Sequence, residues 1–373
     1  MNQNLYLQTD IEEICDRLAT EAQILSGKTI LLTGSCGFLG IYFSAFFDQL
    51  NRKVLSRSSR VLAFDNFISS SISAKTFESF ESIKLSNHDV TQSLKIDEQI
   101  DYIIHLAGIA SPVWYRTHPL ETLDVSVTGT RNMLELARSC HASFLHFSSS
   151  EIYGDPDPRH VPTAESYYGH LSCRGQRACY DEGKRVGETL CDIYHDHYAV
   201  RTISVRPFNV YWPGMREHDY RVLPSFASRL KAGLPLQIYG TGKQTRTFCY
   251  VTDAIVGAML VLLKGVSGEA YNIGNPKPEI SMRDLAKLVC EIYGSKAQYK
   301  VQDYPAGYPN NEPLRRCPEL TKALLHLDYR PTVSLDDGIR RFLDWTKVTY
   351  VGEEDSSAEI LRKSRSGKNR SSA

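Results

Sequence analysis

Tyr180 and Lys184 are the residues whose types and spacing most clearly suggest chemistry. They are four positions apart, so on a helix their side chains lie on one face. A free tyrosine is a poor base at neutral pH, and we expect a cation one turn away to lower its pKa. Upstream, Ser149, Ser150 and Glu151 in SSSEIYG can bring hydroxyl and carboxylate groups to the same reacting oxygen. A lone Y-x-x-x-K is usually a chance helical pair, but here the two motifs occur together.

A glycine-rich turn precedes this region. The segment KTILLTGSCGFLG contains a buried strand followed by Gly34, Gly37 and Gly40, in G-x-x-G-x-x-G spacing at the start of a helical pattern. Glycines allow the backbone to approach a pyrophosphate, and the N-terminus of the following helix favours its negative charge. The turn therefore predicts a dinucleotide site.

Asp65 ends the next expected strand, 61–65. An acid there can accept hydrogen bonds from both adenosine-ribose hydroxyls, which favours NAD. The following NFISSS has no Arg or Lys for a 2′-phosphate. The alternative is a simple strand-end turn residue. The long interval between Gly40 and Asp65 predicts a loop at 51–60.

Further along, Asp89 follows another short strand and is expected to contact the adenine amino group. The strand and loop 102–110 end in small residues that leave room for a cofactor. The predicted cofactor-binding set is Gly34, Cys36, Gly37, Phe38, Leu39, Gly40, Asp65, Asn66, Asp89, Val90, Leu106, Ala107, Tyr180 and Lys184.

The alternation of strands and helices predicts an α/β fold, a Rossmann-type doubly wound parallel sheet with a smaller mixed α/β C-terminal substrate lobe. A fifth strand, 143–147, delivers Ser148–Glu151 at its carboxyl end, where ligands bind in open α/β sheets. Strand 270–274 is assigned to the smaller lobe. The predicted units are an N-terminal helical extension (1–27), an NAD-binding domain (28–205, with 249–265 returning to it), a substrate-binding lobe (206–350) and a disordered tail (351–373).

The N-terminal extension predicts an amphipathic helix over 9–25. Thr9 or Asp10 can cap it, and its apolar stripe includes Ile11, Ile14 and Ile24. We expect this helix to pack on the outside of the domain or on a second subunit.

Composition narrows the partners and the compartment. Among 373 residues, Lys+Arg and Asp+Glu both number 43, so the formal charge is zero and nucleic acid is not expected as a partner. The nine cysteines include no C-x-x-C, which indicates a reduced intracellular protein. No signal peptide is evident, the apolar run 255–263 is too short to span a membrane, and no metal-ligand spacing occurs. We therefore expect a cytoplasmic protein.

At the motifs TGSCGFLG, HLAGIASP, SSSEIYG, CYDEGKR, RPFNVYWPGM and GTGKQTRTFCYVTDA the chain resembles the extended short-chain dehydrogenase/reductases. More narrowly it is similar to the UDP-glucuronate decarboxylases, which make UDP-xylose with NAD. The resemblance implies that Tyr180, Lys184 and Ser149 form the oxidoreduction triad, that Ser150 and Glu151 act on the uronic sugar, and that Tyr115 and Arg316 contact its carboxylate. It assigns Asn209, Arg221, Gln244 and Arg246 to the nucleotide diphosphate, which makes 206–350 a nucleotide-sugar-binding lobe, and it implies a homodimer.

The resemblance also implies a reaction. Oxidation at C4 gives a ketone β to the carboxylate carbon, CO₂ leaves, and reduction recycles the cofactor. The pattern departs from this family at Trp212, Gly214 and Tyr220. A UDP-hexuronate 4-epimerase would use the same triad and is the main alternative. A 4,6-dehydratase would need an acid at Ser150, and a non-catalytic NAD-sensing regulator would not need both Tyr180 and Lys184.

Overall fold

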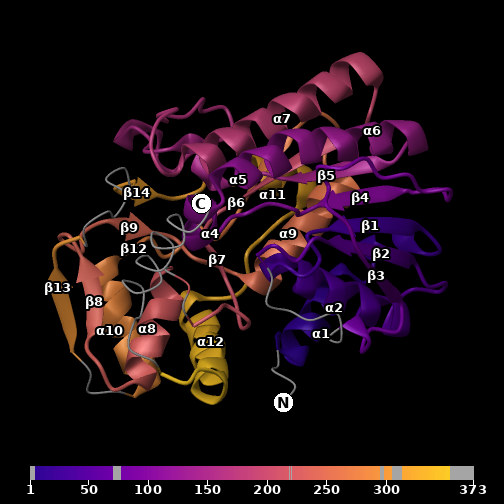
Figure 1. Cartoon of the computed structure of the whole chain (residues 1–373). Helices are drawn as coiled ribbons and strands as arrows, with labels where there is room; N and C mark the ends of the chain where they lie inside the picture. Colours follow the sequence, from indigo (N-terminus) through magenta and orange to yellow (C-terminus); the bar gives the residue numbers. More distant parts are fainter. Residues whose placement is uncertain are drawn as a thin grey trace, which may run out of the picture.

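The computed structural model describes residues 5–69, 77–217, 219, 221–294, 298–304 and 313–352. Its largest element is a seven-stranded parallel sheet with the order β11-β6-β5-β4-β1-β2-β3 (Figure 1). This is the predicted Rossmann-type arrangement. The strands are β1 (Thr29–Thr33), β2 (Arg60–Asp65), β3 (Ile83–Asn87), β4 (Tyr102–His105), β5 (Ser143–Phe147), β6 (Thr202–Pro207) and β11 (Ala270–Ile273).

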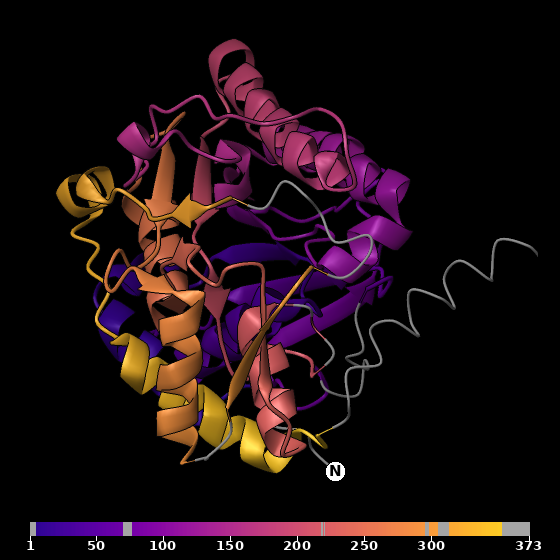
Figure 2. The same cartoon turned by 90° about the vertical axis from the view of Figure 1, so that its left-hand side faces the viewer.

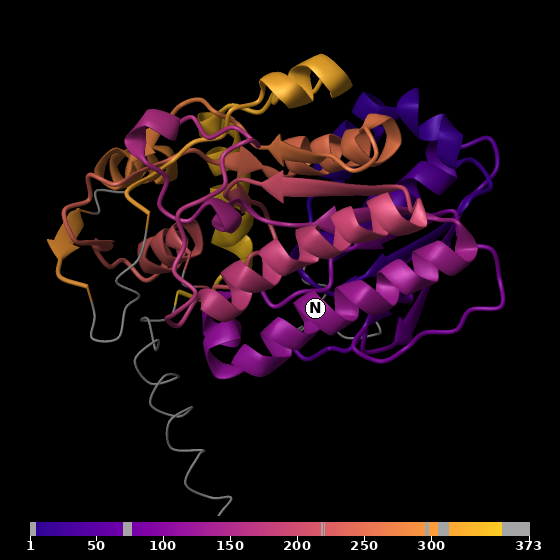
Figure 3. The same cartoon turned by 90° about the horizontal axis from the view of Figure 1, so that it is seen from above.

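Helices cover both faces of this sheet. On one face, α2 (Phe38–Lys53) and α9 (Val251–Lys264) both pack against α1 (Gln8–Leu18). On the other, α5 (Pro119–Asp124), the π-helical turn η2 (Val125–Gly129) and α6 (Thr130–Cys140) form one rod, and α6 lies beside α7 (Ala178–Tyr198) (Figure 3). Coverage of both faces explains why the central strands are continuous apolar runs.

The interval after the glycine turn differs from the prediction. Residues 51–53 continue α2 rather than starting a loop, so the connection to β2 is only 54–59. Asn51 is buried. Its Nδ2 donates a hydrogen bond to the backbone O of Ser59, and its Oδ1 accepts one from the backbone N of Ser59, both at 2.8 Å. These bonds close the short connection, and its Ser- and Arg-rich sequence concealed the helix end.

The strand 270–273 also corrects the sequence assignment. It was placed in the smaller lobe, but β11 pairs in parallel with β6 at the edge of the large sheet, Ala270 opposite Ser204 and Ile273 opposite Pro207. The helix α9 packs on this sheet next to β6. A strand that follows a crossover helix usually pairs within the same sheet. Because α9 packs on the large sheet, the strand that follows it, β11, is expected in that sheet.

The smaller lobe lies at the carboxyl ends of these strands. It contains α8 (Val222–Lys231), α10 (Met282–Tyr293) and α12 (Leu335–Thr349), with α10 and α12 packed together, orange and yellow in Figure 2. The remaining elements are β7 (Val210–Tyr211), β8 (Leu236–Tyr239), β9 (Thr245–Arg246), β10 (Cys249–Tyr250), β12 (Ile280–Ser281), β13 (Tyr299–Gln302), β14 (Arg315–Arg316) and α11 (Thr321–Leu327).

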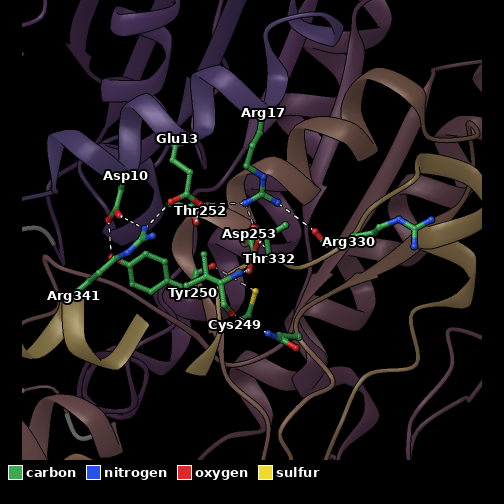
Figure 4. Close-up of polar contacts among 12 residues, drawn as sticks. Asp10, Glu13, Arg17, Cys249, Tyr250, Thr252, Asp253, Arg330, Thr332 and Arg341 are labelled. Carbon is green, nitrogen blue, oxygen red and sulfur yellow. Dashed lines mark hydrogen bonds and ion pairs between the residues drawn. The ribbon is translucent and has the colours of Figure 1, made fainter. Parts of the chain in front are cut away.

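The N-terminal helix α1 ties the two parts of the molecule together (Figure 4). Arg17 forms an ion pair with the buried Asp253 of α9 at 2.8 Å. Arg341 of α12 bonds to Glu13 at 2.7 Å and to Asp10 at 3.1 Å. The helix therefore packs on the outside of the large sheet, as expected, and also contacts the smaller lobe.

Two details of the N-terminal helix were predicted wrongly. The helix begins at Gln8 without a side-chain cap, and Asp10 faces inward, accepting hydrogen bonds from Tyr250 at 2.8 Å and Tyr42 at 3.1 Å. Ile24, assigned to the apolar stripe, is 56% exposed in the 3₁₀ turn η1 (Glu21–Leu25). The change to 3₁₀ geometry breaks the 3.6-residue period on which the stripe was drawn.

Of the predicted tail, 351–373, residues 353–373 lie outside the described residues. No helix in the described part of the chain combines the length and apolar character that crossing a membrane would require.

Candidate active site

A cleft of about 880 Å³ opens at the carboxyl ends of the parallel strands, between the large sheet and the smaller lobe. All fourteen residues of the predicted cofactor set line it. Ser149, Ser150 and Glu151 line the same cleft. The sheet thus gathers residues that are far apart in the chain, as its topology requires.

The glycine turn is shaped by close backbone approaches. Gly34 has φ +69°, and a Cβ there would stand 2.7 Å from the backbone N of Ala107. A Cβ at Gly40 would stand 2.2 Å from the carbonyl O of Gly34. Gly37 directly precedes Phe38, the first residue of α2. The turn therefore requires glycine at these contacts and opens onto a helix N-terminus, which suits a pyrophosphate.

Asp65 sits at the end of β2 beside this turn. Its carboxylate accepts hydrogen bonds from the backbone N of Cys36 at 2.9 Å and of Phe67 at 2.7 Å. Burial nevertheless raises the pKa of Asp65. In the next loop, Asp89 accepts a hydrogen bond from Asn66 Nδ2 at 3.1 Å. The glycine turn and the two carboxylates fit a dinucleotide such as NAD, because they join an anion-binding backbone to acceptors for a ribose and an adenine.

Sequence reasoning missed Arg216 in this region. Its guanidinium comes from the smaller lobe and donates to the carbonyl O of Ser69, 2.5 Å away, in the loop that follows Asp65. Arg216 also lines the cleft. The segment after Asp65 has no base of its own, but the fold brings one to it.

Tyr180 and Lys184 lie in the first two turns of α7, both buried. Lys184 Nζ donates to the carbonyl O of Phe147 at 2.6 Å and stands 5.9 Å from the ring centre of Tyr180. Burial lowers the pKa of Lys184 to about 8. A Cβ on Gly108 would approach this Nζ to 3.2 Å, so the small residue leaves space for the ammonium group.

The expected lowering of the Tyr180 pKa is wrong for this state of the site. Burial raises the pKa of Tyr180 to about 12, against the opposing hydrogen bond with Ser149, and the negative charge of Glu151 raises it further. Lys184 is directed at the Phe147 carbonyl, and the desolvation of the phenolate is the largest influence on the pKa of Tyr180.

Ser149, Ser150 and Glu151 enter the cleft on the tight turn η3 (Ser150–Tyr153). Ser149 caps it by accepting a hydrogen bond from the backbone N of Glu151 at 3.2 Å. Glu151 binds Arg316 bidentately, at 2.5 and 2.8 Å. It also pairs with Arg177.

These arginines control the charge of Glu151. Burial alone would raise its pKa, but the charges of Arg177 and Arg316 outweigh it and lower the pKa of Glu151 to about 2. The carboxylate is therefore ionised at any physiological pH.

Arg177 and Asp181 are further residues that sequence reasoning missed. Arg177 Nε lies 3.5 Å from Asp181 Oδ2, one helical turn along. Burial and the negative charge of Glu151 raise the pKa of Asp181 to about 7. Their i, i+4 spacing around Tyr180 was visible in RACYD, but nothing local connected the pair to Glu151.

The residues predicted to bind substrate divide into two groups. Asn209 and Arg221 line the cleft, with the Arg221 guanidinium 4.6 Å from the ring centre of Phe38. Four others, all set back from the described wall of the cleft, are Tyr115, Gln244, Arg246 and Arg316.

Three of these four residues lie on or next to the strands β9 and β14. Arg246 on β9 stands opposite Arg316 on β14 in a parallel pair. Gln244, next to β9, donates to the carbonyl O of Tyr239 at 3.1 Å. Glu151 therefore stands between the cleft and a group of arginines.

Comparison with known proteins agrees with this geometry. The family model described as "NAD dependent epimerase/dehydratase family" matches residues 30–274. UDP-glucuronic acid decarboxylase 1 of Xenopus tropicalis is 37% identical over 319 residues, covering 85% of this chain and 72% of the relative. UDP-glucuronic acid decarboxylase 5 of Arabidopsis thaliana is 38% identical over 316 residues, covering 84% and 88%.

Among solved structures, UDP-glucuronic acid 4-epimerase from Bacillus cereus, in complex with UDP-glucuronic acid and NAD, is similar in fold. It is 26% identical, has a TM-score of 0.71, and the match covers 86% of this chain and all of that one (100%).

Proposed function

The chain belongs to the NAD dependent epimerase/dehydratase family, and from that premise we propose that it converts UDP-glucuronate to UDP-xylose and CO₂. The observation that carries the proposal is the pairing of Glu151, on the turn that follows Ser149, with Arg316 of β14. The charge of Glu151 also acts on Tyr180. A buried arginine at such a site suits recognition of a carboxylate, because its planar fork matches carboxylate oxygens. The identities of 37% and 38% to UDP-glucuronic acid decarboxylases support the same reaction.

The cofactor of this reaction is NAD, which suits the glycine turn and Asp65. When bound, it accepts the electrons of the C4 carbinol and later returns them, so no net oxidation results. The residues that would hold it are those of the glycine turn, Asp65, Asp89 and the loop 106–107, which line the cleft together.

Tyr180 is the group that removes the proton of the sugar 4-hydroxyl. For this the phenol must ionise, against the burial that raises its pKa. The chain opposes that cost in two ways: the Ser149 hydroxyl hydrogen-bonds the phenolic oxygen, and Lys184 keeps an ammonium 5.9 Å from the ring centre. A base poised in this way contributes by general acid–base catalysis.

Carbon dioxide leaves after oxidation at C4. The C4 ketone is β to the carboxylate carbon, so the C5–C6 bond breaks and its electrons are held as an enolate. A proton must then be added at C5. Glu151 lines the cleft but is ionised, so we assign it the orientation of a water that donates this proton, with Ser150 beside it.

A UDP-hexuronate 4-epimerase is the second candidate, favoured by the structural similarity to the Bacillus cereus enzyme. It would use Tyr180 in the same way but would retain the carboxylate. The decarboxylase relatives, at higher identity, favour loss of CO₂.

We also propose a homodimer formed by α5 and α7 of two copies. Apolar side chains are exposed on these helices: Leu120 is 72% exposed, and Leu123, Val186 and Ile193 are also exposed. A second copy of the same helices would bury this surface. Sedimentation equilibrium tests the proposal, with Ile193→Asp expected to give monomers.

A cytoplasmic location is proposed on the nine cysteines, all of which are free thiols in the structure. A reducing compartment preserves such thiols. Cell fractionation of the tagged protein tests it.

The decisive experiment is NMR of the products formed from UDP-glucuronate labelled with ¹³C at C6. Decarboxylation predicts one labelled CO₂ per UDP-pentose and no label in the sugar. Retention of the label in UDP-galacturonate would instead establish the epimerase. Tyr180→Phe serves as the control for turnover by contaminants.

A further inference from the structure

The carboxylate site of the cleft is already occupied by the protein itself. Arg316 is 5% exposed, and its Nη1 and Nη2 both bond to Glu151. Glu151 lines the cleft, whereas Arg316 is absent from its described lining. A carboxylate entering the cleft therefore meets Glu151 before it can reach Arg316.

Arg177 offers Glu151 a second partner. Its Nη2 bonds to Oε2 of Glu151, the same oxygen that accepts from Arg316 Nη2 at 2.8 Å. Glu151 can thus turn about Oε2, give up Arg316, and keep its bond to Arg177. Arg177 is held from its other side by Asp181, whose Oδ2 is 3.5 Å from Nε.

The charged groups around Glu151 form a cluster whose net charge can be neutralised by one more anion. Three guanidinium groups act on Glu151, those of Arg177, Arg316 and Arg246, and the carboxylates are Glu151 and Asp181. With every group ionised, the cluster carries a net positive charge. The arrival of one ligand carboxylate neutralises it, whereas an uncharged sugar leaves the charge unbalanced.

We infer that Arg177 is a positioning residue that receives the Glu151 carboxylate when a uronate carboxylate takes its place on Arg316. The inference rests on the proposed function, because it requires a uronate in the cleft. It assigns selectivity for the carboxylate to an exchange between two arginines. In this exchange no covalent bond changes; one ion pair at Arg316 replaces another.

The exchange has a measurable consequence. Without Arg177, Glu151 keeps Arg316 as its remaining partner of the two. It then competes more strongly with the ligand carboxylate for Arg316. Affinity for UDP-glucuronate should then fall about 10-fold or more, the scale of one lost charged hydrogen bond. Affinity for UDP, which has no carboxylate, should be unchanged. When Glu151 is replaced by Gln and no longer competes for Arg316, the loss of Arg177 should not change the affinity for UDP-glucuronate.

The test is calorimetric titration of the NAD-loaded enzyme with UDP-glucuronate and with UDP. All variants carry Tyr180→Phe, so that the ligand is not consumed. They are Arg177→Gln, Arg177→Lys, Glu151→Gln and the double variant Arg177→Gln/Glu151→Gln. Arg174→Gln, an exposed arginine three residues upstream, is the matched control.

The inference predicts weaker UDP-glucuronate binding in Arg177→Gln alone, partial recovery in Arg177→Lys, and no effect of Arg177→Gln in the Glu151→Gln background. Equal weakening for UDP would make Arg177 a structural residue and overturn the inference. Weakening that persists without Glu151 would mean direct contact between Arg177 and the ligand, which also overturns it.

The outcome is separable from the proposed function. A wild-type enzyme that keeps C6 in the product is not a decarboxylase, but the binding titrations still decide the exchange. A parent protein that binds UDP-glucuronate no more tightly than UDP-glucose overturns the exchange directly.

Discussion

The rings of Tyr115 and Tyr180 are stacked, with centroids 5.8 Å apart and planes 17° from parallel. Tyr115, on the short helix α4 (Pro112–Thr117), is 3% exposed and lies behind Tyr180 rather than in the cleft wall. The sequence had assigned it to the sugar carboxylate. The carboxylate contact stays a prediction, and from the stacking we propose that Tyr115 fixes the plane of the Tyr180 phenol.

This stacking predicts different effects for two substitutions at Tyr115. Tyr115→Phe keeps the ring and should leave kcat and KM for UDP-glucuronate near wild type. Tyr115→Leu removes the stack and should lower kcat up to about 10-fold, because an aromatic pair contributes about 0.5–1.5 kcal/mol of positioning. Steady-state kinetics decides the matter: a raised KM in Tyr115→Phe would restore the carboxylate contact predicted from the sequence.

Tyr180→Phe removes the phenolic oxygen and leaves the ring stacked on Tyr115. Turnover should fall by about 10²–10⁴-fold, the usual contribution of a general base. The melting temperature should change little, since the lost polar contact is one hydrogen bond with Ser149. Activity close to wild type in a folded Tyr180→Phe protein would exclude Tyr180 as the base.

We expect the choice between NADH and NADPH to depend on Asp65 and, in this fold, on Arg216. Asp65 should favour NADH over NADPH, because its carboxylate repels a 2′-phosphate. Asp65→Ser should weaken NADH binding by about 10-fold and reduce the preference for NADH over NADPH. Arg216, bonded to the carbonyl of Ser69, is the cation placed to attract the phosphate.

Fluorescence titrations with NADH and with NADPH test this cofactor preference. The double variant Asp65→Ser/Arg216→Ala is the matched comparison, and it should lose whatever NADPH affinity Asp65→Ser gains. Tighter binding of NADPH than NADH by the wild-type protein would contradict the role of Asp65.

The elements that the sequence predicted well carry their signal locally. The glycine turn, the buried runs of β1 and β4 and the first turns of α7 each follow from residues within one element, and their arrangement around the cleft follows from the topology of a parallel sheet. The helix α2 extended past its prediction because polar residues at its end concealed the period.

What the sequence missed depends on contacts between distant segments. Arg216 meets the loop after β2 from another lobe, and Arg177 meets Arg316 only through Glu151. The Tyr180 pKa was predicted in the wrong direction for a related reason: the spacing shows Lys184, but the burial that raises the pKa is a property of the folded site. Composition and periodicity carry no information on such pairings.

Asp181 gives a prediction about stability and pH. Burial and the charge of Glu151 raise its pKa to about 7, whereas an unfolded aspartate titrates near about 4. Between these values the folded protein binds a proton that the unfolded chain has released. The contribution of Asp181 to stability must therefore fall as pH rises from about 4 to about 7, and it is constant above that range.

Asp181→Asn removes this titration while preserving the size of the side chain. The melting temperature of the variant relative to wild type should rise from pH 4 to pH 7 and then remain level, as measured by circular dichroism across that range. Asp196→Asn, at an exposed carboxylate on the same helix α7, is the matched control. A difference between Asp181→Asn and wild type that stays constant with pH would mean that Asp181 is ionised throughout. In that case the charge of Arg177, whose Nε is 3.5 Å from Asp181 Oδ2, would offset the effect of burial on the pKa of Asp181.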